Sequence, residues 1–271
     1  MPELPEVETV VRDLRPLLVG RTITNIETSR LALRRRWPAN ASRSLIDRTV
    51  ISVDRRGKWI VIELDEPALL VHLGMTGQFT VAPADVPRQD HTHFIFRLDN
   101  TQELRFRDIR RFGSVSLYSG LAELRESFIA SKLGPEPFDV DPKMWHASLK
   151  KTNRNLKACL LDQRLIAGVG NIYADEALFE AKLNPKTLGS KLTRPQAERL
   201  RLAVEKVLRR GIELRGSTIR NYVGGSGLQG AMQNEFQAYG RTGEPCSRCS
   251  QPIERIVLAG RSTHFCPRCQ R

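Results

Sequence analysis

The chain has 271 residues, of which 40% are hydrophobic and 27% charged, a composition that supports a packed core and argues against wholesale disorder. Its 43 Lys and Arg exceed its 30 Asp and Glu, and the net charge of +13 favours a polyanionic partner, nucleic acid before membrane. The apolar runs are too short to span a bilayer, and the acidic first residues do not form a signal peptide. We therefore expect a soluble cytoplasmic protein with no membrane partner, although charge alone leaves open a basic surface without a committed partner.

An amphipathic helix is predicted over residues 4–18. Apolar side chains recur there at alternating steps of three and four residues, at Leu4, Val7, Val11, Leu14 and Leu18. Gly20 is a suitable stop for this helix. Pro16 is expected to kink the helix or to end it early, because proline lacks the N–H that a helix interior needs.

The hydrophobic period changes to two after Gly20, as is typical of β-strands. Residues 94–98 and 103–107 alternate in this way and flank the polar turn 99–102, which predicts a β-hairpin. No crossover helix separates the predicted strands up to residue 120. This pattern favours an antiparallel sandwich or barrel over a doubly wound parallel sheet.

The second part of the chain is predicted to be helical. Its start is marked by the segment 133–137, Leu-Gly-Pro-Glu-Pro, which indicates a domain boundary. Thr193 and Gln196 form a capping box that opens a long helix, with proline in its first turn. Residues 224–230 contain four glycines and predict a flexible loop.

Four of the five cysteines form two CxxC pairs near the C-terminal end, namely Cys246, Cys249, Cys266 and Cys269. In a reducing compartment such pairs are metal ligands before they are disulfides. Four thiolates satisfy the tetrahedral preference of Zn²⁺ and leave no position for a substrate water, so we expect one structural zinc ion. Cys159 lies alone and is expected to be a buried helix residue.

Two glycines, Gly168 and Gly170, precede Asn171 and a predicted helix over residues 172–179. The unpaired amides at the start of a helix bind anions, and glycines let a phosphate approach the backbone. Ordinary turn chemistry is the alternative, and for a GxG sequence alone it is the more common one. Lys157, upstream on another predicted helix, shifts the balance towards phosphate binding.

Pro2 follows the initiator Met1, and removal of that methionine would leave a secondary amine at the start of the chain. An α-amine titrates near 8, so roughly a tenth of it is neutral at pH 7. Attack of such an amine on a sugar carbon yields an iminium ion, which serves as an electron sink for elimination. Glu3 and Glu6 lie close enough in sequence to move protons, whereas a proline without any catalytic role is the alternative that these six residues alone favour.

Taken together, these motifs resemble the formamidopyrimidine-DNA glycosylase family over the whole chain. The segments that carry the resemblance are the N-terminus, the helix-two-turn-helix signature and the flanks of the cysteine module, at residues 2–8, 160–163, 167–176, 239–241 and 263–267. The resemblance implies an α+β multidomain fold. Its parts are an α-helix with an antiparallel β-sandwich, a helical helix-two-turn-helix domain and a four-cysteine zinc finger, in residues 1–133, 134–235 and 236–271 respectively.

The resemblance also implies roles for individual residues. Pro2 would be the Schiff-base nucleophile, and Glu3 the proton donor that opens the deoxyribose ring. Lys58 would reach the lesion and donate a proton for β-elimination, while Arg261 would contact phosphate and donate a proton for δ-elimination. The other residues implied to bind DNA are four phosphate-side contacts, His72, His91, Lys157 and Asn171, and a wedge that fills the gap left by an extruded base, Met75, Arg110 and Phe112.

The implied activity is that of a bifunctional DNA glycosylase and abasic-site lyase of base-excision repair, acting on oxidised purines in damaged double-stranded DNA. The protein would act as a monomer, associated with the bacterial nucleoid through DNA. One alternative is an endonuclease VIII-like specificity for oxidised pyrimidines, which Leu4 disfavours because that group commonly has glycine at this position. The other alternative is a zinc-dependent DNA-binding protein without catalysis.

Overall fold

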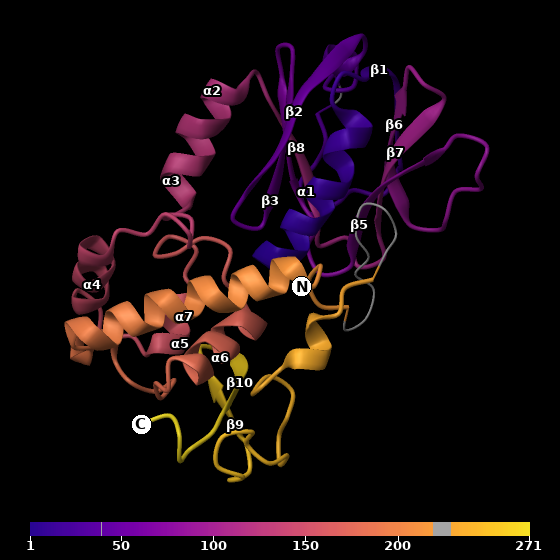
Figure 1. Ribbon diagram of the computed structural model, residues 1–271. Coiled ribbons are helices and arrows are strands. Elements are labelled where there is room, and N and C mark those ends of the chain that lie inside the picture. The colour runs from indigo at the N-terminus through magenta and orange to yellow at the C-terminus, as the bar shows by residue number, and fades with distance from the viewer. Residues whose placement is uncertain (39, 219–228) are drawn as a thin grey trace. The chain divides into compact units, whose positions relative to one another are not determined.

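The computed structural model describes residues 1–38, 40–218 and 229–271 (Figure 1). The chain forms two compact units, of which the first contains residues 1–131 and 214–231 and the second residues 132–213 and 232–271. The domain boundaries expected after residues 133 and 235 are based on sequence motifs, and they stay a prediction. Among the described residues, no helix is both long enough and apolar enough to cross a membrane.

Helix α1 (Leu4–Leu18) opens the first unit, as the sequence predicts. Its apolar residues, among them Leu4, Val7 and Leu14, are fully buried. The helix runs past Pro16 to Leu18, so the expectation that proline would end it early is not met. The missing N–H of Pro16 would bond the carbonyl of Arg12, and Arg12 lies on the exposed face of the helix, where water can satisfy that carbonyl.

Eight antiparallel strands follow α1 in this unit, in the spatial order β5-β7-β6-β1-β2-β3-β4-β8. Their bounds are β1 Thr22–Thr28, β2 Arg48–Arg56, β3 Trp59–Leu64, β4 Ala68–His72, β5 Gly77–Pro83, β6 Thr92–Leu98, β7 Gln102–Asp108 and β8 Ser114–Tyr118. Strands β1 and β2 pair over two residue pairs only, Thr22 with Thr49 and Ile23 with Arg48. Two four-stranded layers therefore meet at this short junction, which confirms the expected antiparallel sandwich.

The core of the sandwich contains the buried side chains of both layers and of α1. Phe79 stands edge-on to Phe96 and Phe106, at ring-centroid distances of 6.4 and 5.7 Å, a favourable arrangement for aromatic rings. A short helical stretch follows β8 and comprises α2 (Leu121–Leu124), a π-helical turn (Arg125–Ile129) and α3 (Ala130–Lys132). This core fixes the strand ends from which the candidate site residues extend.

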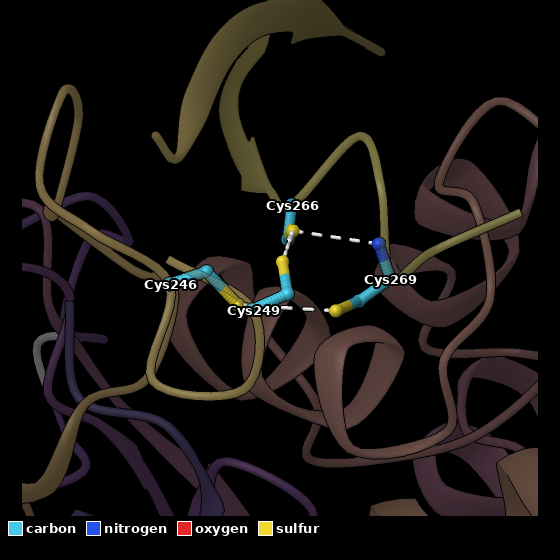
Figure 2. Close-up of side chains that lie close together, drawn as sticks. All are labelled: Cys246, Cys249, Cys266 and Cys269. Carbon is cyan, nitrogen blue, oxygen red and sulfur yellow. Dashed lines mark hydrogen bonds between the residues drawn. The ribbon is translucent and has the colours of Figure 1, made fainter. Parts of the chain in front are cut away.

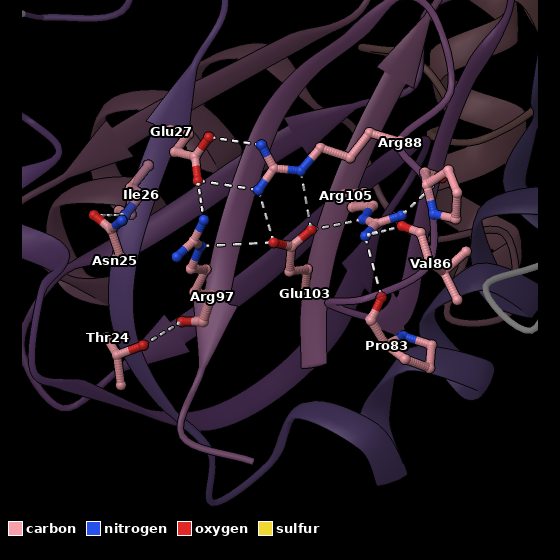
Figure 3. Close-up of polar contacts among 11 residues, drawn as sticks. Thr24, Asn25, Ile26, Glu27, Pro83, Val86, Arg88, Arg97, Glu103 and Arg105 are labelled. Carbon is pink, nitrogen blue, oxygen red and sulfur yellow. Dashed lines mark hydrogen bonds and ion pairs between the residues drawn. The ribbon is translucent and has the colours of Figure 1, made fainter. Parts of the chain in front are cut away.

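A cluster of charges covers one face of β1, β6 and β7 (Figure 3). Arg88 bonds both Glu27 and Glu103, at 2.7 and 2.8 Å. Arg97 pairs with the same two carboxylates, at 2.7 and 3.6 Å, and Arg105 bonds Glu103 at 2.8 Å. The hydrogen bonds from Arg88 hold the pKa of Glu27 below its ordinary value. Three arginines thus share two carboxylates. These ion pairs stabilise the sheet, and they leave this part of the positive charge less available to bind a polyanion.

The second unit is helical, with a small β-hairpin (Figure 1). Its helices and strands are α4 Pro142–Lys150, α5 Leu156–Leu161, α6 Asn171–Glu180, α7 Arg194–Glu213, β9 Glu254–Leu258 and β10 Arg261–Phe265, with 3₁₀ turns at Gly189–Lys191 and Met232–Glu235. The predicted capping box is present, since the Thr193 N–H donates to Gln196 Oε1 at 2.9 Å. Helix α6 is buried along residues 172–179 and forms the centre of the unit.

Gly211 is the contact point at which α7 packs against α6. A Cβ atom at this position would lie 2.6 Å from Cε1 and Oη of Tyr173, whose side chain is fully buried. The close contact between α7 and α6 therefore requires glycine here.

We expect Gly211→Ala to lower the free energy of unfolding by about 1–3 kcal/mol through overpacking, although Gly→Ala in an exposed helix raises stability by about 1 kcal/mol. Urea denaturation measures the change. Leu202→Ala, at a half-exposed position of the same helix, is the control and should change stability by less than about 0.5 kcal/mol.

Candidate functional site

The start of the chain is held in the first unit by a capping box. Pro2 is buried, and Glu3, the N-cap of α1, is only 2% exposed. The Glu3 backbone N–H donates to Glu6 Oε2 at 2.8 Å, and the Glu3 side chain accepts from the Glu6 backbone in return. The candidate nucleophile and the candidate proton donor are therefore fixed next to each other by helix geometry.

Glu6 also ties α1 to a segment two hundred residues away in sequence. Its Oε1 accepts the Ser217 N–H at 2.7 Å and the Ser217 hydroxyl at 3.1 Å. Gly216 has φ +77, and a Cβ there would lie 2.8 Å from Glu6 Cγ. On the other side, the Gly230 N–H donates to Thr218 Oγ1 at 2.8 Å. Residues 224–228 of the predicted flexible loop lie outside the described residues, whereas Ser217 is bonded to α1 and Gly230 is bonded to Thr218.

The N-terminal amine lies in a partly desolvated environment with charges of both signs. Burial lowers the pKa of the Met1 amine from 8 against the opposing charges of Glu3 and Glu6, and the charges of Lys58 and Arg110 make smaller contributions in the same direction as burial. Lys58 is 6% exposed and follows Gly57, which turns the chain between β2 and β3 with φ +57. The structure thus brings the predicted Lys58 and Arg110 into electrostatic reach of the chain start.

His72 ends strand β4 and is neutral at pH 7. Burial, followed by the charge of Lys58, lowers its pKa from 6.5 to about 4. Its Nδ1 accepts the Gly74 N–H at 3.0 Å, so the proton is on Nε2, and its ring lies 4.5 Å from that of Trp59. His72 therefore presents a single N–H donor in a fixed orientation, whereas His91 is exposed and has the unusual φ of 66.

Large side chains stand out from two loops of this unit. Met75 is 42% exposed and Phe112 is 44% exposed. The guanidinium of Arg110 lies over the Phe112 ring, 4.6 Å from its centroid, a cation–π contact that keeps both side chains together. Met75 and Phe112 are therefore among the large apolar side chains that this unit exposes, and Arg110 lies against one of them.

Lys157 in the second unit does not occupy the position that the sequence suggests for a direct phosphate contact. It is fully buried, and its Nζ donates to the Asn171 carbonyl at 2.8 Å and to Asp175 Oδ1 at 2.6 Å. A buried ammonium needs such partners, because leaving it without them is very costly. Lys157 therefore holds the first turn of α6 in place, and any effect on a bound anion is indirect.

Asn171 is the first residue of α6 and has a side chain with unused hydrogen-bonding capacity. Its Oδ1 is buried and makes no hydrogen bond within the described part of the chain. The preceding turn is rigid, since Gln163 donates to the Val169 carbonyl at 2.8 Å and accepts the Gly168 N–H at 2.9 Å. An anion at the start of this ten-residue helix would bond N–H donors, the side-chain Nδ2 of Asn171 among them, whereas the unpaired Oδ1 is an acceptor and would bond a donor.

The four cysteines of the two CxxC pairs come together as predicted (Figure 2). All four sulfur atoms lie within 4.8 Å of one another. Cys249 Sγ is 3.5 Å from Cys266 Sγ, and Cys246 Sγ is 4.0 Å from Cys269 Sγ. A tetrahedral zinc ion with Zn–S bonds of about 2.3 Å separates its sulfur ligands by about 3.8 Å, so the thiols fit one structural zinc ion.

The finger is anchored to α6 by two adjacent acidic residues. Asp175 Oδ2 accepts the His264 N–H at 2.9 Å, and the His264 ring nitrogen Nδ1 lies 3.0 Å away. Glu176 accepts three successive backbone N–H groups, those of residues 237–239, at 2.8–2.9 Å. Arg261, the expected phosphate contact, is exposed at the start of β10, next to the hairpin turn. Helix α6 therefore determines where the finger presents Arg261.

Three of the residues that organise the site are missed by sequence reasoning, namely Asp108, Asp175 and Glu176. Each is an acidic side chain that is at least 97% buried and binds groups distant in sequence. Acidic residues usually lie on the surface, and no local spacing signals an exception. The adjacent Asp175-Glu176 on a helix that is otherwise hydrophobic is the one signal that could have indicated a buried role.

Comparison with known proteins gives matches along the chain. The family models that match are the formamidopyrimidine-DNA glycosylase N-terminal domain, its H2TH domain, and the zinc finger found in FPG and IleRS, over residues 1–115, 133–223 and 243–271. The formamidopyrimidine-DNA glycosylase of Herpetosiphon aurantiacus is 47% identical over 285 residues and that of Bacillus licheniformis 42% over 275, each covering 100% of both chains.

Solved structures of Lactococcus lactis Fpg are similar as well. A variant of that protein, in complex with DNA containing Fapy-dG, has a TM-score of 0.93 at 39% identity and covers 100% of both chains. A complex of Lactococcus lactis Fpg with DNA containing an abasic site has a TM-score of 0.92 at 38% identity and covers 99% of both chains. The likeness therefore extends over the whole fold.

The depressed pKa of His72 makes stability depend on pH. Between pH 4 and 6.5 the unfolded chain binds a proton at this residue and the folded chain does not. The stability that neutral His72 contributes to the folded chain is therefore complete above pH 6.5 and is lost as the pH falls to 4. We expect the wild type to lose about 3 kcal/mol more unfolding free energy than His72→Asn between pH 7 and 4, as measured by urea denaturation. His91→Asn, at an exposed position, should behave as the wild type. Equal losses in wild type and His72→Asn would contradict this assignment.

The metal site predicts one zinc ion per chain. Metal analysis of the purified protein should give one equivalent, and Cys249→Ser should lower both the zinc content and the resistance of the C-terminal segment to proteolysis, because three ligands bind the ion more weakly. Cys159→Ala is the matched control, since Cys159 is buried outside the cluster and should leave the zinc content at one. A full equivalent of zinc in Cys249→Ser would contradict the four-thiolate site.

Proposed function

The chain belongs to the formamidopyrimidine-DNA glycosylase family, and on that premise we propose that it removes oxidised purines, such as 8-oxoguanine and formamidopyrimidines, from double-stranded DNA and then cleaves the abasic strand. Its partner is damaged DNA, as in the structures of its Lactococcus lactis relative. All the relatives named above are bacterial, and the net charge of +13 suits a protein that works as a monomer on chromosomal DNA in the bacterial cytoplasm.

The observation that carries the proposal is the environment of the chain start. Burial lowers the pKa of the Met1 amine in spite of the opposing charges of Glu3 and Glu6, which increases the neutral, nucleophilic fraction of the amine at pH 7. Removal of Met1 would transfer the amine to Pro2, within the same capped turn. The carboxylate of Glu3 lies next to it and can supply or accept a proton.

The proposed chemistry follows from these groups. The neutral Pro2 nitrogen attacks C1′ and the bond between C1′ and the damaged base breaks, with the electron pair leaving on the base, which takes a proton from water. The Glu3 carboxylate accepts the N–H proton of the attacking proline. Glu3 then passes this proton to O4′ as the C1′–O4′ bond opens, which leaves an iminium ion on the proline nitrogen. That cation accepts electrons while β-elimination and then δ-elimination expel the two flanking phosphates, assisted by Lys58 and Arg261, and a one-nucleotide gap results.

The remaining residues are assigned to binding. We place His72, His91, Asn171 and Arg261 against backbone phosphates, with Lys157 as a residue that positions the start of α6. Such contacts fix register on the duplex and make the affinity depend on salt. The zinc ion stabilises the finger that carries Arg261, and it takes no part in the reaction because all four of its positions are filled by thiolates.

Met75, Arg110 and Phe112 form the proposed wedge. Extruding a nucleotide costs a few kcal/mol of stacking and pairing. An apolar side chain inserted into the gap recovers part of the stacking, and an arginine can bond the base left without a partner. The half-exposed Met75 and Phe112 and the adjoining guanidinium have the required chemistry.

The assignment of Pro2 is tested by borohydride trapping with duplex DNA that contains an abasic site. The wild type should form a covalent adduct, and Pro2→Gly should lower base excision at least tenfold, because a primary amine forms an imine that can lose its charge by deprotonation. Pro87→Gly, in an exposed loop, is the control and should retain full activity. Wild-type DNA binding without any adduct would instead indicate a DNA-binding protein that lacks catalysis.

The substrate class is tested with a panel of lesions under single-turnover conditions. We expect duplexes with 8-oxoguanine or formamidopyrimidine to be cleaved at least tenfold faster than a duplex with thymine glycol. The opposite order would assign the chain to the pyrimidine-specific branch. An undamaged duplex of the same sequence serves as the control and should remain intact.

A further inference from the structure

Asp108 lies at the junction of the two loops that carry the wedge residues. It is the last residue of β7, and its side chain is fully buried. One loop joins β4 to β5 and contains Met75, while the other joins β7 to β8 and contains Arg110 and Phe112. Nothing in the composition of either loop explains why they keep one conformation, since both carry exposed, bulky side chains.

The Asp108 carboxylate hydrogen-bonds to both loops. Its Oδ1 accepts the Thr76 hydroxyl at 2.5 Å and the Arg110 N–H at 3.3 Å. Its Oδ2 accepts the Gly113 N–H at 2.7 Å. The Thr76 hydroxyl oxygen in turn accepts the Arg110 N–H at 3.1 Å. One side chain thus joins the two loops through three donors.

Backbone contact reinforces this junction. A Cβ atom on Gly74 would lie 2.4 Å from the Gly113 nitrogen, and one on Gly113 would lie 3.0 Å from Asp108 Oδ2. The two loops therefore touch main chain to main chain, with the carboxylate beside the contact. On the opposite side, the Asp108 carbonyl lies 3.0 Å from His93 Nε2, which anchors the end of β7 as well.

Each wedge residue is the sequence neighbour of a group in this junction, or belongs to it. Met75 precedes Thr76, Arg110 bonds Asp108 through its own N–H, and Phe112 precedes Gly113. We propose that Asp108 is a positioning residue for base extrusion, which holds the two loops as one rigid wedge before DNA binds. This inference rests on the proposed function, because it assigns Asp108 a role in filling the gap that the excision reaction requires.

The physical reason is pre-organisation. Ordering a loop on binding costs about 1–2 kcal/mol of backbone entropy per residue, and a wedge that is already fixed avoids this cost during extrusion. A carboxylate is suited to the task because it offers two acceptor oxygens and charge-assisted bonds. An asparagine would replace one of these oxygens with an amide N–H₂ group, which faces a donor and leaves it without an acceptor.

The test compares Asp108→Asn with the wild type on two substrates. The first is a duplex with 8-oxoguanine, with 2-aminopurine beside the lesion to report unstacking. The second is a single-stranded oligonucleotide with an abasic site, which has no duplex stack to open and is trapped with borohydride. We expect duplex excision and the 2-aminopurine signal to slow at least tenfold, and single-strand trapping to stay within twofold. Asp85→Asn, which removes a charge from an exposed loop, should match the wild type on both.

Other outcomes overturn the proposal. Equal losses on both substrates would mean that Asp108 serves only the general fold, and unchanged duplex excision would mean that the wedge does not need it. Should Asp108→Asn fail to fold by thermal denaturation, Thr76→Val removes the hydroxyl between the loops and retains the buried carboxylate, with the same expectations and the same contradicting results. Failure of the wild type itself to excise the lesion would overturn the proposed function instead, so the two failures are distinguishable.

Discussion

Buried carboxylates that accept backbone N–H groups are the interaction on which the functional segments depend. Glu6 holds the chain start against residues 216–217, and Asp108 joins the loop that contains Met75 to the loop that contains Phe112. Asp175 bonds Lys157, which holds the first turn of α6, and Asp175 and Glu176 together fix the zinc finger to that helix. A desolvated carboxylate that lost these donors would be strongly destabilising, so each one enforces a single arrangement of the loops around it.

Burial and charges of both signs set the properties of the chain start. Glu3, Glu6, Lys58 and Arg110 all act on the terminal amine. Burial is the largest influence on this amine and on His72. It lowers the pKa of the terminal amine against the opposing charges of Glu3 and Glu6, and together with the charge of Lys58 it lowers the pKa of His72, which is neutral at pH 7. Desolvation within the first unit therefore favours a neutral, nucleophilic amine.

Buried contacts hold the backbone segments from which the exposed side chains extend. Met75, Phe112 and Arg261 have exposed side chains, but each projects from backbone that is anchored nearby, at the Asp108 junction or in the finger fixed to α6. Lys157 shows the reverse arrangement, since its charge is buried and acts through the helix start that it holds. The residues proposed to bind DNA are thus held in place by buried interactions that do not themselves reach the surface.

The sequence by itself determined the elements whose signal is local. The periodicity of residues 4–18 is sufficient for α1, because helix burial repeats every three to four residues, and the CxxC spacing is sufficient for the zinc site. Only the tertiary structure decided that Lys157 is buried and that Asp108 joins two loops. Those features depend on partners 18 residues away for Lys157 and 32 residues away for Asp108. The packing of the sheet and of the helices decides which distant groups meet, and the spacing of residues along the chain does not predict it.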